Sequence, residues 1–293
     1  MATGKPEIAD QLLERGAKAI RSSRSVDLWR PSDARVNAEE LLGEVLGKQI
    51  TTDDLDSQIT PAKIKRFDQL VARRVAGEPV ALILGYTEFR KLKLIVRKGV
   101  FVPRNTSELM AEKAIARLRS RRNPVAVDVA TGTGPVALAI ADGAKNAEVY
   151  GLDIWRPSLV VARQNASQLG LKVHFILSDL LAKLPRALEG KVDVFTCHPP
   201  YVARSQLRGL PKEIKDFEPR VSLSDNSVDG LSLVRRLAQD SPGWLRRGGW
   251  LLFEISPDLS RQVATIMRRS GFERVKSERD SLGATRVVSG RWP

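Results

Sequence analysis

The sequence predicts an α/β protein in which a mostly parallel sheet flanked by helices follows a small helical domain. From about residue 105 to the end, short apolar runs alternate with stretches of helical periodicity, which is typical of parallel strands joined by helices. A glycine-rich turn joins a continuous apolar run, 125–129, to a helical stretch, 135–141. Residues 1–78, in contrast, show helical spacing only. A chain of 293 residues is long enough for a large domain and a small one.

The helical domain contains three predicted helices. Apolar residues fall at helical spacing over 7–22 and over 34–46, and a third helix begins after Thr60. Two β-type runs follow, 86–94 and 95–102, and predict a β-hairpin. The predicted parts are therefore a helical domain over residues 1–78 that recognises a partner, a hairpin linker over 79–104 and a large domain over 105–293.

The large domain is predicted from its alternating pattern. Its helices and strands are expected in the order of a mostly parallel sheet with an antiparallel edge. The expected elements are helix 107–118, strand 125–129, helix 135–141, strand 149–152, helix 157–169, strands 173–177 and 192–196, helix 231–238, strand 250–255, helix 259–269 and the edge runs 272–277 and 285–289.

Composition excludes several classes of function. Cys197 is the only cysteine, and His174 and His198 are the only histidines, so no internal disulfide and no Cys/His zinc cluster can form. We expect no metal site. No apolar run approaches the roughly 18 residues of a membrane span, and residues 1–7 lack the apolar stretch of a signal peptide. These features predict a cytoplasmic protein with no membrane partner, and they leave its oligomeric state open.

The net charge of +14 is unevenly distributed. Residues 1–80 contain as many acidic as basic side chains, so the whole excess lies in residues 81–293. This excess favours an anionic partner or cofactor for the large domain, although a generally basic proteome would produce it too. Nucleic acid is an alternative partner on this ground but is not favoured, because the helix dipole explains the arginines at a helix end better.

The glycine-rich turn predicts a site for an adenosine-containing cofactor. Gly132 and Gly134 can adopt backbone angles closed to other residues, and they let a ligand approach the main chain. Asp153 ends the next apolar run, at a strand end where an acid commonly binds ribose hydroxyls. The turn also fits the G-x-G-x-x-A pattern of dinucleotide-binding proteins, so a nicotinamide cofactor is an alternative at this point.

A second motif, Cys197-His198-Pro199-Pro200-Tyr201, directly follows the apolar run 192–196. Two prolines after a buried strand remove two backbone donors and form a rigid turn at the carboxyl end of the sheet, where ligands bind. Such a turn can direct its carbonyl groups at a reacting group.

His-Pro-Pro-Tyr resembles the Asn-Pro-Pro-Tyr motif of S-adenosylmethionine-dependent methyltransferases that act on planar nitrogens. Further stretches in the same order narrow the resemblance to the HemK/PrmC family, the protein-(glutamine-N5) methyltransferases of peptide chain release factors. The resemblance covers about residues 38–288. Its stretches are Ala76-Gly77-Glu78-Pro79, Ile83-Leu84-Gly85, Glu88-Phe89, Phe101-Val102-Pro103-Arg104, Phe217-Glu218-Pro219-Arg220, Asp229-Gly230-Leu231 and Gly248-Gly249-Trp250-Leu251-Leu252-Phe253-Glu254-Ile255.

The resemblance implies a Rossmann-like, seven-stranded methyltransferase domain, S-adenosyl-L-methionine as the cofactor and a release factor as the partner. The implied cofactor-binding residues are Asp128, Ala130, Thr131, Gly132, Gly134, Asp153, Ile154, Trp155, Asp179, Leu180 and His198. The implied substrate-binding residues are Phe101, Arg104, His198, Pro199, Tyr201 and Glu218. The implied catalytic residues are His198, Pro199, Pro200 and Tyr201.

The motif suits a difficult reaction, because the lone pair of an amide nitrogen is delocalised into the carbonyl. In the family, the Asn side chain and the carbonyl of the following proline accept the two amide hydrogens and aim the nitrogen at the methyl group. Positioning of this kind can contribute roughly 7–11 kcal/mol. By resemblance, the carbonyl of Pro199 and the ring of Tyr201 keep these roles.

His198 departs from the family, which has Asn at this position. A neutral imidazole has one acceptor nitrogen and an imidazolium has none. His198 could instead act as a general base toward an amine, guanidine or hydroxyl of a small metabolite or nucleic acid. Alternatively, His198 could indicate that the protein has lost catalysis and acts only by binding its cofactor or a partner. Ala130 is a second departure, because the family has a glycine at this position of the loop. The loop can accommodate an alanine there if its φ is negative.

Overall fold

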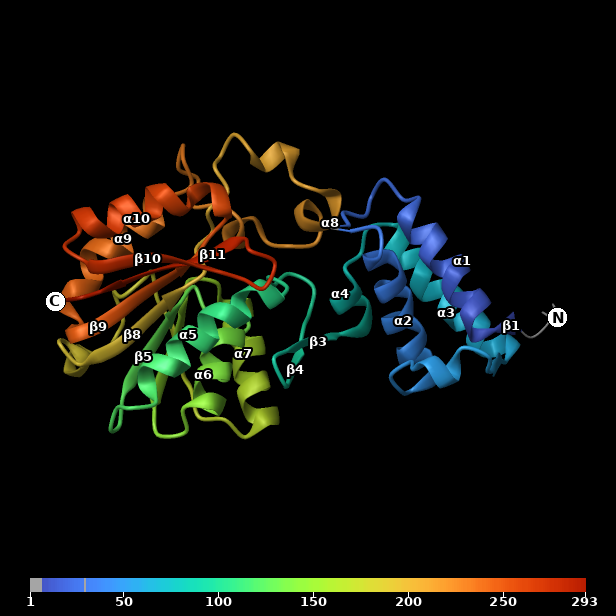
Figure 1. Cartoon of the computed structure of the whole chain (residues 1–293), viewed down its shortest axis with the longest axis horizontal. Coiled ribbons are helices and arrows are strands. Elements are labelled where there is room, and N and C mark those ends of the chain that lie inside the picture. Colours follow the sequence, from blue (N-terminus) through green and yellow to red (C-terminus); the bar gives the residue numbers. More distant parts are fainter. Residues whose placement is uncertain (1–6, 29) are drawn as a thin grey trace. The chain divides into compact units, whose positions relative to one another are not determined.

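A seven-stranded sheet forms the centre of the larger of two units in this computed structural model, which describes residues 7–28 and 30–293 (Figure 1). Strands β5 to β9 run parallel in the order β9-β8-β5-β6-β7, and β11 lies antiparallel to both β9 and β10 at the edge. The predicted α/β class is confirmed. The strands are β5 (Val125–Val129), β6 (Glu148–Asp153), β7 (His174–Leu177), β8 (Val192–Cys197), β9 (Leu245–Glu254), β10 (Glu273–Arg279) and β11 (Thr285–Arg291).

Helices cover both faces of this sheet. Successive side chains of a strand point to opposite faces, so Val127 of β5 packs in the core under α9 and α10, whereas Ala126 packs under α5, α6 and α7. The helices are α5 (Glu108–Leu118), α6 (Pro135–Gly143), α7 (Arg156–Leu169), α9 (Ser232–Asp240) and α10 (Ser260–Arg269).

The strand order reverses at β5, which pairs with β6 on one side and with β8 on the other. The helix after β5 lies on one face of the sheet, and the helix that precedes β9 lies on the opposite face. Such a reversal leaves a crevice at the carboxyl ends of the strands, where ligands bind in open α/β sheets. The glycine loop follows β5 and the His-Pro-Pro-Tyr turn follows β8, so the fold brings the two motifs to one crevice.

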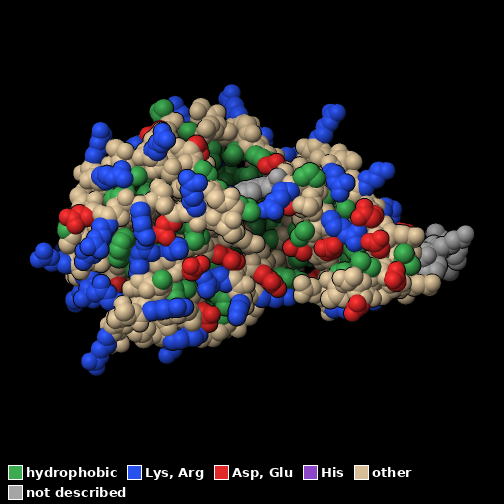
Figure 2. All heavy atoms as spheres, in the orientation of Figure 1, with side chains coloured by type: hydrophobic (Ala, Val, Ile, Leu, Met, Phe, Trp, Pro, Cys, Tyr) green, Lys and Arg blue, Asp and Glu red, His purple; other side chains and the backbone are tan. Residues whose placement is uncertain are grey.

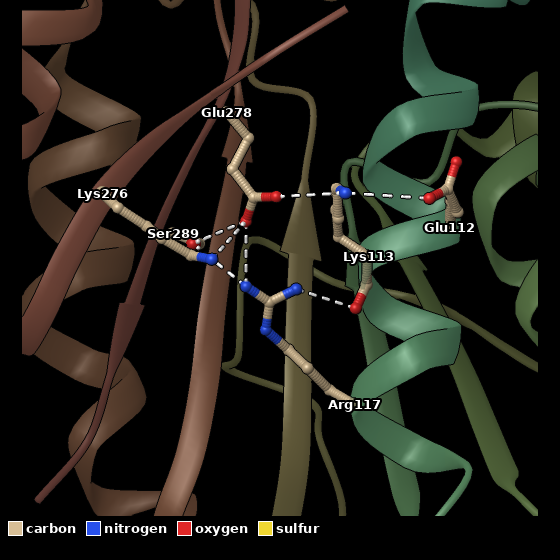
Figure 3. Close-up of polar contacts among 6 residues, drawn as sticks. All are labelled: Glu112, Lys113, Arg117, Lys276, Glu278 and Ser289. Atoms are coloured by element: carbon tan, nitrogen blue, oxygen red, sulfur yellow. Dashed lines mark hydrogen bonds and ion pairs between the residues drawn. The ribbon is translucent and has the colours of Figure 1, made fainter.

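An ion-pair cluster attaches the edge strand β10 to helix α5 (Figure 3). Glu278 accepts a hydrogen bond of 3.0 Å from Arg117, and it lies 3.4 Å from Lys113. Arg117 also donates to the Ser289 hydroxyl at 3.1 Å, and its guanidinium lies 4.4 Å from the centre of the Trp250 ring. Because Arg117 and Glu278 are both largely buried, their charges are little screened by water.

The smaller unit is helical, and it combines the residues up to Tyr86 with the later segment Gly209–Glu218. Buried Arg74 of α3 donates to Asn37 at 2.7 Å and to Glu213 at 2.6 Å, which ties the segment to the helices. No pattern in the sequence predicted this return of the chain. The elements of the unit are β1 (Glu7–Ile8), α1 (Ala9–Arg21), α2 (Asp33–Leu46), β2 (Gln58–Ile59), α3 (Pro61–Val75), α4 (Val80–Leu84) and α8 (Lys212–Lys215).

The hairpin differs from its predicted extent. β3 (Tyr86–Phe89) and β4 (Leu92–Ile95) are shorter than the predicted runs, and the turn lies at Arg90 and Lys91 rather than near residue 94. Arg90 adopts a φ of 55°, a conformation that Gly or Asn usually announces in a sequence. The remaining helical turns are 3₁₀ helices at Thr52–Asp54, Asn105–Ser107, Arg186–Leu188, Leu207–Gly209, Arg220–Ser222, Ser241–Gly243 and Pro257–Leu259. Within the described ranges, no helix has both the length and the apolar character needed to cross a bilayer.

Candidate functional site

A pocket of about 310 Å³ opens where the parallel strands end, and every residue that lines it belongs to the larger unit. Gly134, Pro199 and Tyr201 do not line it but are chain neighbours of residues that do, and Glu218 belongs to the smaller unit. The predicted site residues that line the pocket are Phe101, Arg104, Asp128, Ala130, Thr131, Gly132, Asp153, Ile154, Trp155, Asp179, Leu180, His198 and Pro200.

The glycine loop exposes its main chain to the pocket because alternate residues adopt positive φ. The φ angles of Ala130, Gly132 and Gly134 are 56°, 58° and 87°. The value for Ala130 corrects the expectation of a negative φ: the alanine adopts left-handed geometry at a cost of about 1–2 kcal/mol. Leu180 and Asn226, which also line the pocket, have φ angles of 47° and 61°. Strain of this kind concentrates at functional sites.

Asp128, at the end of β5, fixes the start of the loop. Its two carboxylate oxygens accept hydrogen bonds from the hydroxyls of Thr131, at 2.6 Å, and Thr196, at 2.7 Å. Burial raises the pKa of Asp128 to about 7, although these two hydrogen bonds counteract the shift. Neighbouring Cys197 is fully buried, and burial raises the pKa of its thiol, so it stays protonated.

Asp153, at the end of β6, connects the loop to the pocket wall. One carboxylate oxygen accepts the Gly132 N–H and the other accepts the Trp155 N–H, each at 2.7 Å. Burial raises the pKa of Asp153, and these backbone hydrogen bonds partly offset that effect. The backbone N–H of Ile154 also contacts this carboxylate. Its two oxygens together offer about four lone-pair sites, so the oriented carboxylate can still accept a ligand hydroxyl.

An apolar wall adjoins this carboxylate. Ile154 and Trp155 line the pocket and remain 58% and 38% exposed, so their apolar surface is accessible to a ligand. The Trp155 ring donates to the carbonyl of Gly99 at 3.0 Å, which fixes its orientation. Asp179, after β7, pairs with Arg236 at 2.8 Å. A flat, partly polar ligand would cover this wall.

His198 is held on several sides. Its Nδ1 lies 3.4 Å from the hydroxyl of Ser107 and 3.5 Å from a carboxylate oxygen of Glu254. The Phe101 ring meets the imidazole edge-on, with ring centres 5.5 Å apart, and the Tyr201 ring stacks on it at 5.7 Å. Burial raises the pKa of Tyr201 to about 12, so the phenol remains protonated. The ring of His198 is thus oriented before any ligand binds.

The loop over residues 220–231 supports the turn from the other side. The carbonyl of Pro200 accepts the Asp225 N–H at 3.1 Å. Gly230 has a φ of 71°, and a Cβ at this position would collide with the carbonyl oxygen of Tyr201. Close packing against the His-Pro-Pro-Tyr turn therefore explains the glycine of the Asp229-Gly230-Leu231 motif.

Ser107, Thr196, Arg236 and Glu254 contact predicted site residues but were not among the predicted functional residues. Only Glu254 left a trace in the sequence, because an acid ending the apolar run 250–253 is unusual in a buried strand. The other three are brought to the site by tertiary packing.

Comparison with known proteins identifies the family. A model described as PrmC N-terminal domain matches residues 11–85, and one described as methyltransferase domain matches residues 120–224. A release factor glutamine methyltransferase of Bordetella pertussis is 34% identical over 89% of this chain and 96% of its own length. This chain belongs to the release factor glutamine methyltransferase family.

Further members of the release factor glutamine methyltransferase family match over similar lengths. The Moorella thermoacetica protein is 36% identical over 87% of this chain and 88% of its own, and the Burkholderia pseudomallei protein is 33% identical over 100% of both. The HemK/PrmC resemblance is confirmed, and the nicotinamide alternative is set aside. Among solved structures, the T. thermophilus 16S rRNA N2 G1207 methyltransferase has a TM-score of 0.53 at 17% identity, covering 71% of this chain and 50% of its own, a likeness in fold alone.

Proposed function

We propose that this protein transfers a methyl group from S-adenosyl-L-methionine to the side-chain amide nitrogen of a glutamine in a peptide chain release factor. The observation that carries the proposal is the meeting of the glycine loop, the Asp153 carboxylate and the His-Pro-Pro-Tyr turn at one pocket. The substrate class is supported by the relatives, which are release factor glutamine methyltransferases over nearly their full length.

The pocket residues suit each part of this cofactor. Left-handed backbone at Ala130, Gly132 and Gly134 lets a charged amino-acid group approach backbone N–H groups of the loop. Asp153 has free lone pairs for ribose hydroxyls, and the exposed face of Ile154 can cover an adenine ring beside Asp179. When bound, S-adenosyl-L-methionine supplies an electrophilic methyl group on a sulfonium.

In this proposal the His-Pro-Pro-Tyr turn holds the side-chain amide of the substrate glutamine. The carbonyl of Pro199 and one ring nitrogen of His198 each accept an amide hydrogen, and Pro200 keeps the main chain rigid between them and Tyr201. That ring nitrogen can also take the proton that leaves the amide. Tyr201, Phe101 and Arg104 pack against the substrate; the Arg104 guanidinium already lies 5.0 Å from the centre of the Phe101 ring.

The smaller unit recognises the release factor in this proposal. Its match to the PrmC N-terminal domain supports that role. The family resemblance also assigns Glu218 to substrate binding. Glu218 is buried and ends the segment of the smaller unit that follows the His-Pro-Pro-Tyr turn in sequence.

The test is mass spectrometry of the organism's own release factors after incubation with the protein and S-adenosyl-L-methionine. We expect one added methyl group on the glutamine of the Gly-Gly-Gln loop. The matched control is a release factor with that glutamine replaced by asparagine, which should gain none. Absence of methylation by a preparation shown calorimetrically to bind the cofactor would overturn the proposal.

A second candidate is methylation of a nitrogen in a nucleic acid. The whole charge excess of +14 lies in residues 81–293, and Figure 2 shows Lys and Arg side chains gathered over the larger unit while acidic and basic side chains mix over the smaller one. A non-catalytic role is the remaining alternative, and turnover in the experiment above would exclude it.

A further inference from the structure

We infer that Glu254 is a positioning residue that holds the ring proton of His198 on Nδ1, so that Nε2 is left as the hydrogen-bond acceptor for the substrate amide. The inference rests on the proposed function. Glu254 would allow a histidine to accept the amide hydrogen that an asparagine accepts in the family. The inference concerns an arrangement that exists only because His198 occupies this position.

Glu254 is the last residue of β9 and is 3% exposed. Its oxygen Oε2 has no hydrogen-bond partner among the residues that the structure describes, yet it lies 3.5 Å from Nδ1 of His198. A buried carboxylate oxygen without a donor is unfavourable. Of the two ring nitrogens, Nδ1 is the one that lies beside this oxygen, so a proton on Nδ1 can be donated to it and a proton on Nε2 cannot.

The Ser107 hydroxyl, 3.4 Å from the same nitrogen, does not oppose this assignment. A hydroxyl can donate or accept, so it adapts to whichever tautomer is present. A carboxylate can only accept, so Glu254 decides which ring nitrogen carries the proton.

The second ring nitrogen remains available. His198 lines the pocket, and within the described part of the chain no protein group hydrogen-bonds to Nε2. Contacts with Phe101 and Tyr201 restrict rotation of the ring. Nε2 and the carbonyl of Pro199 then present two acceptors, which match the two hydrogens of a primary amide. Without Glu254, the tautomer with its proton on Nε2 would place one hydrogen-bond donor, the Nε2–H of His198, against another, the N–H of the substrate amide.

Nitrogen NMR of the untagged protein, labelled with ¹⁵N-histidine, tests the tautomer directly. The chain has only two histidines, so His174→Gln assigns both rings. At a pH where the ring is neutral, we expect the proton of His198 on Nδ1 in the native protein and in Ser107→Ala. In Glu254→Leu, which has no acceptor, we expect the proton on Nε2. Glu254→Gln, which keeps the shape of the side chain but can donate as well as accept, guards against misfolding of the Leu variant and should leave a mixture of the two tautomers.

Methylation kinetics supply the second readout. Glu254→Leu should lower kcat roughly tenfold or more while leaving the affinity for S-adenosyl-L-methionine unchanged. In a His198→Asn background the same change should have little effect, because an asparagine needs no tautomer. A native ring with its proton on Nε2, or a tautomer that ignores Glu254, would overturn the inference. Since NMR needs no substrate, failure of release factor methylation would be seen separately.

Discussion

Ala130 carries backbone strain that a smaller residue would relieve. Its φ of 56° costs an alanine about 1–2 kcal/mol, and a glycine adopts it freely. Because glycine also loses more chain entropy on folding, we expect Ala130→Gly to raise the free energy of unfolding by a net of about 0.5–1 kcal/mol. Urea unfolding without cofactor measures this. Ala137→Gly, in the first turn of α6, is the matched control and should lower stability by about 1 kcal/mol or more, because it weakens the helix and also removes a buried methyl group. A similar loss of stability in both variants would contradict the strain assigned to Ala130.

Single residues also mark the limit of what the sequence could predict about the site. Gly132, Asp153 and the prolines of the turn were found because strand ends and turn residues leave local patterns. The strain of Ala130 depends on the loop closing around it, and the pairing of His198 with Glu254 joins positions far apart in the chain. No local sequence pattern predicts the strain at Ala130 or the pairing of His198 with Glu254.

The attachment of β10 to α5 depends on charge, so it should depend on pH. Burial alone would raise the pKa of Glu278, but the hydrogen bond and charge of Arg117, with Lys276 and Lys113, lower it below its ordinary value. A carboxyl with a lowered folded-state pKa stabilises the fold above its unfolded pKa, and this contribution is lost as the pH falls through the folded pKa.

We therefore expect Glu278→Gln to lower the free energy of unfolding by about 1.5–3 kcal/mol at pH 7. The difference from the native protein should shrink as the pH falls below about 4.5. Chemical unfolding at a series of pH values measures both. Glu112→Gln removes a carboxylate that pairs with the same Lys113 from an exposed position and should cost less than about 1 kcal/mol. A loss for Glu278→Gln that did not vary with pH would contradict the assigned charge effect.

Elements were predicted best where packing repeats a simple period. The helices and parallel strands of the larger unit appear within a few residues of their predicted ends, apart from the earlier start of β9, because each buries one face or both. The hairpin turn at Arg90 and the short helices α4 and α8 lack such periods, since their conformations are imposed by the surrounding structure.

The charge of the whole molecule separates the two proposed substrate classes. A basic surface should attract an anionic partner over distances that salt screens. We expect the KM for the release factor to rise several-fold between about 50 and 300 mM salt while kcat stays nearly constant. RNA and DNA oligonucleotides should bind weakly at about 150 mM salt. Tight nucleic-acid binding together with a salt-independent KM would favour the nucleic-acid alternative.

The segment Gly209–Glu218 limits how this protein could be taken apart or recombined. The helical unit is not encoded by one continuous stretch, because its Arg74 finds its partner Glu213 well inside the sequence of the other unit. A chimaera that exchanged only the residues before Thr87 between relatives would join the helices of one parent to a segment of another. We therefore expect an exchange between relatives to preserve the Arg74–Glu213 contact only when the segment Gly209–Glu218 is exchanged together with the helices.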